Sequence, residues 1–564
     1  MVRVHLGPPM KCLIISGTLS VVDFARTVQF KDCKRIVTTN ALDSYKNNYL
    51  PIKGVSMSAN GILFAKHMKE DKQLVIEERI CIVENSLSPV VTIAGNERQF
   101  FNILSRMSTL GVPGCSIAII ENGQISWSKG YGTTKADSSH LITINTLFQA
   151  GSISKPITAL GALMLVEQGK LDLDKPVNDY LRAWKGEGKI DWIIPENELT
   201  KETPVTLRML LAHRAGLTVA GFPGYEGGQP LPSIMQVLKG EPPAKTPPVI
   251  VDIKPGIKTR YSGGGTMIVQ LLIEQIAAVE NKTFVQWMKE NVLDRIGMEH
   301  STFKCSPSEH PIACGHRGDG SVVPGGAIMY VESAAAGLWT TPLDLAKAAI
   351  AIQDSAQGNA SLLSHAMTLE MLKQQYEDGE YGLGPSISNI NHELAFEHPG
   401  SGDGFAAHWH CLANGDNGIV VMTNAYAGRS LIPEIMMAVQ RAYNLPTLPT
   451  SEIKLGQKII EKYDSFSGAY KIIDGFNINV ICENNNLFIQ QPGANKHELF
   501  QVDTFTFADV QGKGKLIKFN IDATTDQAVG ITIANINGEN PYSYTKLYNL
   551  HVGHNKTANI MSKS

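Results

Sequence analysis

The sequence has no large excess of charge of either sign and no long hydrophobic run. Among its 564 residues, 50 are Lys or Arg and 53 are Asp or Glu, which gives a net charge of −3. No run of basic residues breaks this balance, so the charge pattern favours neither a nucleic-acid nor an anionic-membrane partner. No apolar run reaches the roughly 18 residues of a membrane-spanning helix. We therefore expect no transmembrane segment.

Cysteine is also scarce. The 8 cysteines form no CxxC pair, which argues against zinc-ribbon and thioredoxin-type sites. Cys305 and Cys314 could close a small loop, but free thiols are the expectation. Residues 12–22 resemble a signal peptide only weakly, and no clear cleavage site follows. The sequence therefore leaves both the compartment and the oligomeric state open.

The composition is that of a globular protein, with 43% hydrophobic residues. Its length suggests roughly three or four domains. Residues 1–95 form an N-terminal segment without recognisable chemistry, and residues 96–445 have regular helix and strand patterns. A linker at 446–458 follows. Residues 459–564 contain short alternating runs separated by turns, which predicts a small β-barrel domain.

Local patterns predict several individual elements. Residues 73–82 are typical of a strand. Residues 114–120 and 124–129 are strand-like runs on either side of Asn122-Gly123, and this dipeptide is a strong hairpin signal. An apolar helix pattern covers residues 155–168.

Two Ser-x-x-Lys motifs occur, and their predicted settings differ. Ser126 and Lys129 lie in a predicted strand, where residues three apart point to opposite faces. Ser152 and Lys155 lie at a predicted helix start, where residues three apart are neighbours. There the lysine amine can approach the serine hydroxyl and activate it as a nucleophile. The alternative is that Ser152 only caps the helix and Lys155 is a surface charge.

Two later segments favour the nucleophile. Tyr261 to Gly263 precedes a helix, and His398 to Gly400 precedes a strand-like run. In this order, the three elements resemble the serine β-lactamase and penicillin-binding-protein superfamily, in particular its class C-like branch, which also holds esterases and D-aminopeptidases. The resemblance covers residues 96–445. Further similar segments are Val112 to Ala118, Leu210 to Leu217, Pro255-Gly256 and Ala336 to Thr341.

The resemblance implies an α+β fold, with an antiparallel sheet flanked by helices and a helical subdomain. The C-terminal region is similar, more loosely, to the small lipocalin-like β-barrels that are fused to such hydrolases. Ser152 would be the nucleophile, and Lys155 and Tyr261 would share the role of base. The backbone N–H groups of Ser152 and Ser401 would form the oxyanion hole. His398, Gly400 and Gly263 would contact the substrate.

Two departures from the family pattern bear on the substrate. Gly263 stands where many β-lactamases have an Asn that holds the substrate amide. His398 stands where penicillin-binding proteins have a Lys that binds the substrate carboxylate. With an ordinary pKa near ~6.5, the charge of His398 would vary across the physiological pH range. Both departures favour an esterase or a D-amino-acid peptidase or amidase.

Two alternatives stay open. One is a β-lactamase or D-alanyl-D-alanine carboxypeptidase. The other is a non-catalytic penicillin-binding-like sensor or scaffold, although a binding module has no need of Ser152, Lys155 and Tyr261 together. In each case the partner is a small-molecule or peptide substrate, and no cofactor is implied.

Histidines elsewhere have more ordinary interpretations. His408 and His410 could lie on one face of a strand, but the sequence places no third ligand beside them, so we predict no metal site. His213 is similar to a loop histidine that shapes the family's fold.

Overall fold

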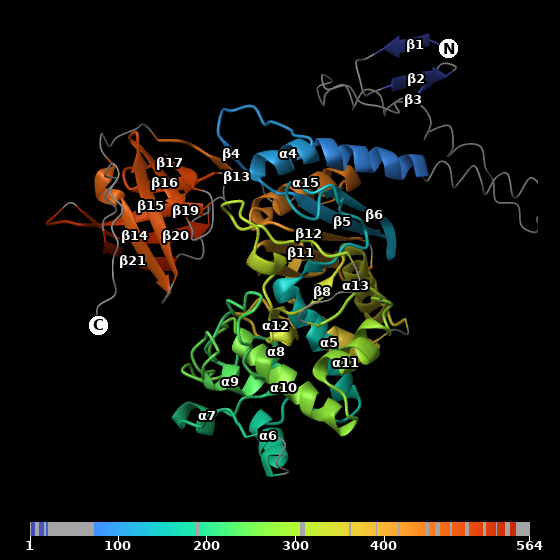
Figure 1. Cartoon of the computed structure of the whole chain (residues 1–564), viewed down its shortest axis with the longest axis vertical. Helices are drawn as coiled ribbons and strands as arrows, with labels where there is room; N and C mark the ends of the chain where they lie inside the picture. The colour runs from blue at the N-terminus through green and yellow to red at the C-terminus, as the bar shows by residue number, and fades with distance from the viewer. Residues whose placement is uncertain are drawn as a thin grey trace, which may run out of the picture. The chain divides into compact units, whose positions relative to one another are not determined.

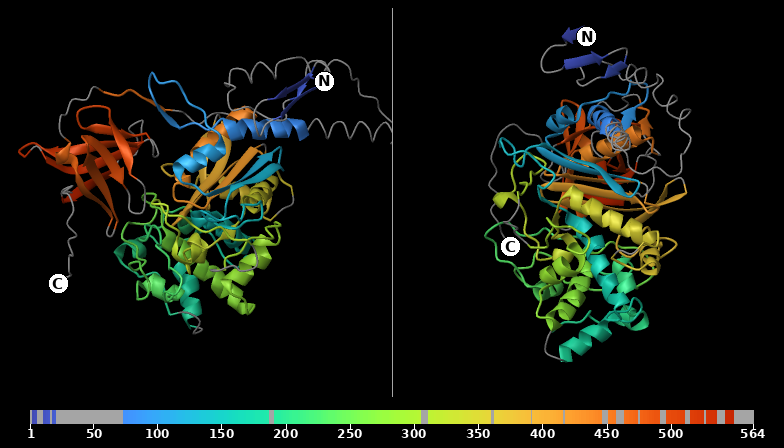
Figure 2. Two further views of the ribbon diagram at one scale, coloured as in Figure 1. Left: turned by 45° about the horizontal axis from the view of Figure 1, so that its top comes forward. Right: turned by 90° about the vertical axis from the view of Figure 1, so that its right-hand side faces the viewer.

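A computed structural model describes most of the chain (Figures 1 and 2). It divides into two compact units, Met1–Gln73 and Leu74–Ser564. In the first unit, the described strands β1 (Val2–His5), β2 (Lys11–Ile15) and β3 (Thr18–Ser20) form an antiparallel sheet. The structure describes residues 2–5, 11–15, 18–20, 73–186, 191–304, 311–359, 362–390, 392–415, 417–445, 451–456, 463–473, 476–490, 496–510, 515–525, 527–535 and 542–548.

The centre of the second unit is a six-stranded antiparallel sheet. The predicted hairpin is present, with Asn122 and Gly123 at φ angles of 53° and 67°, the left-handed conformations that its turn requires. In spatial order, the strands are β6 (Gln124–Gly132), β5 (Gly114–Glu121), β12 (Asn417–Thr423), β11 (Phe405–Leu412), β10 (Glu393–Gly402) and β9 (Ser386–Ile390).

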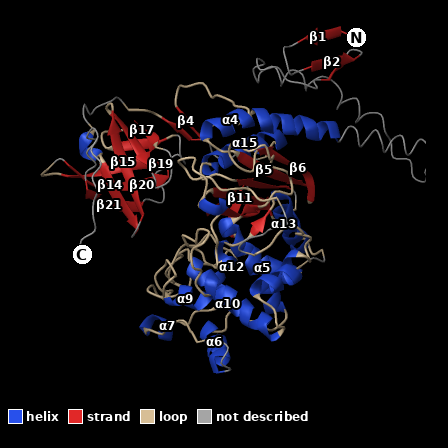
Figure 3. Cartoon of the chain, in the orientation of Figure 1, coloured by secondary structure: helices blue, strands red, loops and turns tan. Residues whose placement is uncertain are grey.

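One face of the sheet is covered by α4 (Ile103–Leu110), α15 (Gly428–Tyr443) and a helix at residues 73–85 (Figure 3). The strand predicted at 73–82 is therefore wrong. Ile76, Ile80 and Val83 recur at helical spacing and pack into the cluster between this face and its helices. β-branched residues thus fit a helix here because they have a core to pack against.

The other face packs on α5 (Ser154–Glu167), α13 (Pro342–Ala356) and a helical subdomain, through the largest hydrophobic cluster of the protein's described part. This arrangement confirms the predicted α+β class. None of the described helices is both long and apolar enough to cross a bilayer. The remaining elements are α6 (Val177–Gly186), α7 (Glu198–Glu202), α8 (Leu207–Leu211), α9 (Ile234–Lys239), α10 (Gly263–Val279), α11 (Phe284–Met288), the π-helical turn η2 (Lys289–Leu293), η3 (Pro324–Gly326), α12 (Ser333–Ala336), α14 (His365–Leu372), and the paired strands β7 (Phe148–Gln149) and β8 (Trp339–Thr340).

The C-terminal region forms the predicted barrel. Eight antiparallel strands close on themselves, because β14 pairs with β21 as well as with β15. Aromatic side chains fill the interior, where the Phe466 and Phe519 rings stack at 4.5 Å between centroids. The elements are η4 (Asp464–Phe466), β14 (Gly468–Ile473), β15 (Phe476–Glu483), β16 (Asn486–Gln490), β17 (His497–Gln501), β18 (Thr506–Asp509), β19 (Lys515–Asp522), β20 (Gln527–Asn535) and β21 (Tyr542–Tyr548).

Two findings bear on the predicted boundaries. Within the linker predicted at 446–458, β13 (Ser451–Ile453) pairs in parallel with β4 (Val91–Ile93). Val83 and Leu87 belong to the predicted N-terminal segment 1–95. They pack into the cluster between the sheet and helices α4 and α15. Cys305 lies outside the described residues, so the possible loop to Cys314 is not described, and the structure shows free thiols at Cys81, Cys115, Cys314, Cys411 and Cys482.

Candidate active site

Ser152 and Lys155 are in direct contact. Ser152 belongs to a short 3-10 turn, η1 (Gly151–Ile153), that runs directly into α5. The Lys155 amine donates a hydrogen bond to the Ser152 hydroxyl over 3.1 Å and another to the Ala335 carbonyl oxygen over 2.9 Å. Lys155 is only 5% exposed, and no side chain caps α5. The geometry therefore disfavours the alternative of a helix cap beside a surface charge.

The second Ser-x-x-Lys motif has no such contact. Ser126 and Lys129 lie on β6 and have different partners. The Ser126 hydroxyl donates to the Glu121 carboxylate over 3.2 Å, and Lys129 pairs with Glu84 at 2.5 Å. This agrees with the alternation of side chains along a strand.

Tyr261 lies beside the Ser152–Lys155 pair. The Lys155 amine nitrogen is 4.8 Å from the centroid of the Tyr261 ring, close enough for a cation–π interaction. Tyr261 lies just before Ser262, which caps α10 by accepting a hydrogen bond from the Gly265 N–H group. The start of α10 thus fixes the chain that carries Tyr261.

His213 packs against Tyr261. Its ring packs 4.4 Å from the Tyr261 ring and 4.7 Å from the Tyr381 ring, measured between centroids. The His213 Nδ1 atom accepts a hydrogen bond from the Ser262 N–H group over 3.2 Å. Burial and the Lys155 charge lower the pKa of His213 well below its ordinary value, so the imidazole is neutral. The sequence indicated a fold-shaping role for His213 but not this contact.

His398 is buried and neutral. It is 2% exposed, and its Nδ1–H group donates to the Pro399 carbonyl oxygen over 2.7 Å. Burial, reinforced by the charge of Lys155, lowers the pKa of His398 to about 3. This corrects our expectation that its charge varies across the physiological pH range, because the sequence alone does not reveal the burial. Its Nε2 atom is buried and has no hydrogen-bond partner among the described residues.

The predicted oxyanion-hole residues lie on two segments in close contact. Gly151 has a φ of +52°, and a Cβ atom on it would come within 2.7 Å of the Ser401 backbone nitrogen. A Cβ on Gly400 would come within 2.1 Å of the Ala150 carbonyl oxygen. Both glycines thus let β10 approach the turn that carries Ser152. The pairing of β9 with β10 stops at Glu397, so strand β9 does not cover this part of β10.

Gly263 is the first residue of α10, and the space beside it is filled. A Cβ atom there would lie 2.7 Å from Cε2 of Phe222 and 3.1 Å from the Ala220 carbonyl oxygen. An Asn side chain at this position would therefore clash with the Phe222 ring unless that ring moved.

We expect Gly263→Asn to lower the free energy of unfolding by about 1–3 kcal/mol, because it overpacks this site. Phe222→Ala in the same chain should recover part of the loss. Urea denaturation of the two single variants and the double variant measures both effects. Equal stability of Gly263→Asn and the natural protein would contradict the packing explanation.

Arg429, in the first turn of α15, was missed by the sequence analysis. Its guanidinium donates a hydrogen bond to the Ser401 hydroxyl and stacks over the Tyr426 ring at 4.3 Å. No motif singled out this arginine, because its relation to β10 depends on how α15 packs on the sheet. A fixed cation therefore contacts the same strand as the neutral His398.

The described geometry brings together the parts that acyl transfer requires. A serine hydroxyl contacts an amine, a tyrosine ring lies beside that amine, and the backbone of a neighbouring strand approaches the serine. Nucleophile, base and backbone donors in this arrangement can form and break an acyl-serine bond.

Comparisons with known proteins identify the family of the chain. The model of the Beta-lactamase family matches residues 101–433, more than half of the chain. Teichoic acid D-alanine hydrolase from Staphylococcus aureus is 24% identical over 282 residues, which cover 49% of this chain and 64% of the relative. Protein flp from Staphylococcus aureus (strain MW2) is 24% identical over 236 residues, which cover 41% of this chain and 42% of the relative. The chain thus spans less than two thirds of the length of either relative.

A solved structure shares the fold. The octameric penicillin-binding protein homologue from Pyrococcus abyssi has a TM-score of 0.51 and 22% identity, with 78% of this chain and 98% of that chain covered. The resemblance to the serine β-lactamase and penicillin-binding-protein superfamily is confirmed, and by the extent of the family match the chain belongs to the Beta-lactamase family.

Proposed function

We propose that the protein is a serine hydrolase that cleaves an ester, amide or peptide bond through an acyl-enzyme on Ser152. The observation that carries this proposal is the 3.1 Å hydrogen bond between the Lys155 amine and the Ser152 hydroxyl, made by a lysine that is almost fully buried. A hydroxyl needs an adjacent base to attack a carbonyl group, and this contact supplies one.

In the acylation step, the Ser152 oxygen attacks the carbonyl carbon while its single proton passes to the Lys155–Tyr261 pair, one member of which is deprotonated before the attack. The negative charge on the carbonyl oxygen is stabilised by the backbone N–H groups of Ser152 and Ser401, and such donors contribute about 2.7–4 kcal/mol each. The tetrahedral intermediate then collapses. The bond to the leaving group breaks, and the leaving alcohol or amine takes the proton from the base.

Deacylation runs through the same groups. Water attacks the acyl carbon and gives one proton to the Lys155–Tyr261 pair. The ester bond to Ser152 breaks, the serine oxygen recovers a proton, and the carboxylic acid leaves. No cofactor takes part in either step.

Substrates with a D-amino-acid acyl group are the best-supported class. The relative from Staphylococcus aureus is named for the hydrolysis of teichoic acid D-alanine. A neutral His398 in place of a lysine removes one cation that could bind a β-lactam carboxylate. Both points support an esterase or D-amino-acid amidase over a specialised β-lactamase.

The test is a probe experiment followed by a substrate panel. A fluorophosphonate should label the full chain at Ser152, identified by peptide mass spectrometry. The panel should contain p-nitrophenyl esters, D-alanyl and L-alanyl esters and amides, and nitrocefin. Turnover of the D-alanyl compounds above the others supports the proposal. Fast turnover of nitrocefin would favour a β-lactamase, and a stable adduct without turnover would favour a sensor.

The charge of His398 gives a separate prediction. Because its pKa is about 3, His398 stays neutral from about pH 5.5 to 8.5. The ratio of kcat/KM for a carboxylate-bearing β-lactam to that for a neutral ester should therefore show no step near pH 6.5. His398→Lys should raise this ratio by less than about tenfold, because a buried cation is costly to desolvate. A step in the ratio that disappears in His398→Gln would contradict a neutral histidine.

A further inference from the structure

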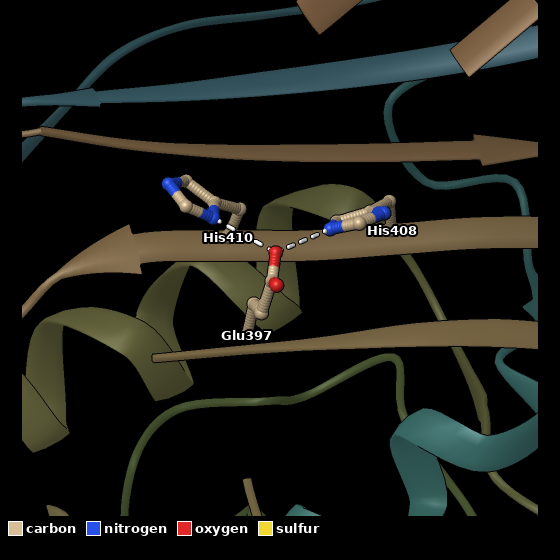
Figure 4. A group of neighbouring side chains, drawn as sticks. All are labelled: Glu397, His408 and His410. Carbon is tan, nitrogen blue, oxygen red and sulfur yellow. Dashed lines mark hydrogen bonds and ion pairs between the residues drawn. The ribbon is translucent and has the colours of Figure 1, made fainter. Parts of the chain in front are cut away.

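Two histidines and one glutamate form a cluster on the six-stranded sheet (Figure 4). Glu397 is the neighbour of His398 on β10, so its side chain points to the other face. It pairs directly with His410 on β11, and His408 lies two residues earlier on that strand. The sheet register therefore brings the three side chains together, which the sequence could not reveal.

The potential ligand atoms converge on one point. Oε2 of Glu397 lies 3.0 Å from Nε2 of His408 and 3.0 Å from Nδ1 of His410. All three potential ligand atoms lie within 4.8 Å of one another. Our prediction of no metal site rested on the lack of a third ligand beside the histidines, and Glu397 occupies that place.

Two imidazole nitrogens and one carboxylate oxygen are a ligand set that Zn²⁺ uses. In a tetrahedral site with bonds of about 2.0–2.1 Å, the ligand atoms are about 3.3 Å apart. The oxygen–nitrogen distances of 3.0 Å are a few tenths of an ångström shorter, so small side-chain rotations would admit the ion. The side chains are 15–28% exposed, which leaves access for the ion and for a water ligand.

We propose that Glu397, His408 and His410 bind one divalent transition-metal ion, with Zn²⁺ as the expected ion. The ion joins β10 to β11 on the face away from the predicted nucleophile. β10 also carries His398, Gly400 and Ser401, so the ion stabilises the strand that approaches Ser152. This role is structural, and it does not depend on the proposed hydrolase activity.

The competing explanation is a carboxylate–imidazole hydrogen-bond cluster without a metal. Burial raises the pKa of Glu397, but the hydrogen bonds from His408 and His410 outweigh burial and bring the pKa well below its ordinary value. The two explanations differ in whether the protein takes up metal with a defined stoichiometry.

The experiment uses the full chain, purified without a histidine tag and stripped with a chelator. Zn²⁺ is titrated by calorimetry, with Mg²⁺ as the hard-cation comparison, and melting temperatures are measured with and without Zn²⁺. Co²⁺ serves as a spectroscopic substitute. We expect uptake of one Zn²⁺ per chain, a higher melting temperature with Zn²⁺, no response to Mg²⁺, and a visible Co²⁺ band typical of a tetrahedral site with nitrogen and oxygen ligands.

Variants link the uptake to these residues. Glu397→Gln and His408→Gln should each weaken Zn²⁺ binding by at least about tenfold and remove the Co²⁺ band, since even outer-shell changes weaken metal affinity 10–100-fold. His140→Gln is the matched control, because His140 is exposed and its ring is bonded only to the Ser138 hydroxyl among the described residues. If one ligand variant fails to fold, the other ligand variant and the natural chain still decide the question. Absence of stoichiometric Zn²⁺ uptake by the natural chain, or uptake that is unchanged in a folded ligand variant, overturns the proposal.

Discussion

Ser152→Ala should abolish fluorophosphonate labelling and reduce ester hydrolysis by about 10⁴- to 10⁶-fold, the scale seen when a hydrolase loses its serine nucleophile. The substitution removes the oxygen that forms the acyl bond and leaves the surrounding groups in place. Because Ser152 lies in a 3-10 turn without a side-chain cap, the fold should not depend on its hydroxyl. Intact-protein mass spectrometry and the p-nitrophenyl ester assay measure the two effects.

Ser126→Ala is the matched control. It alters the other Ser-x-x-Lys motif, whose serine lies on the edge strand β6 and contacts Glu121 on β5 and Tyr443 at the end of α15. Labelling and turnover should stay at the level of the natural protein. Continued labelling of Ser152→Ala, or loss of labelling in a folded Ser126→Ala, would show that Ser152 is not the nucleophile.

The choice between these two serines shows what local sequence can predict. A spacing of three residues brings two side chains together on a helix but not on a strand, so the motif is informative only when the type of element is known. The sequence predicts a helix start at Ser152 and a strand at Ser126. The hairpin at Asn122-Gly123 was also predictable from the sequence. Its turn requires backbone conformations that few residues adopt, and Asn-Gly supplies two of them. The fold class followed from the order of the motifs along the chain.

The features that sequence reasoning missed all depend on tertiary contacts. Ile76 and Ile80 fall in the strand predicted at 73–82, because their β propensity favours a strand when the core that they pack against is not considered. Glu397 joins His408 only through the register of β10 with β11. The loss of charge on His398 comes from burial, which a sequence pattern does not give.

The second large effect is expected at Lys155. Lys155→Met removes the amine that contacts Ser152 and should lower kcat by about 10²- to 10⁴-fold, the usual contribution of a positioned acid or base. It also leaves the buried Ala335 carbonyl oxygen without this donor, which should cost about 1–3 kcal/mol of stability. Activity is therefore measured well below the melting temperature of the variant. Lys129→Met should change neither kcat nor labelling.

Lys155→Arg separates the two roles that the amine could have. An arginine keeps the positive charge and the hydrogen-bond donors, but its guanidinium stays protonated and cannot accept the Ser152 proton. If Lys155 acts as a base, the arginine variant should be as slow as Lys155→Met, although it restores a donor for Ala335. If a fixed positive charge near the serine is sufficient, the arginine variant should keep much of the natural kcat. Fluorophosphonate labelling rates of the natural protein, Lys155→Met and Lys155→Arg give the same comparison for the attack of the serine alone. Labelling of Lys155→Arg as fast as that of the natural protein would contradict the role of Lys155 as the base.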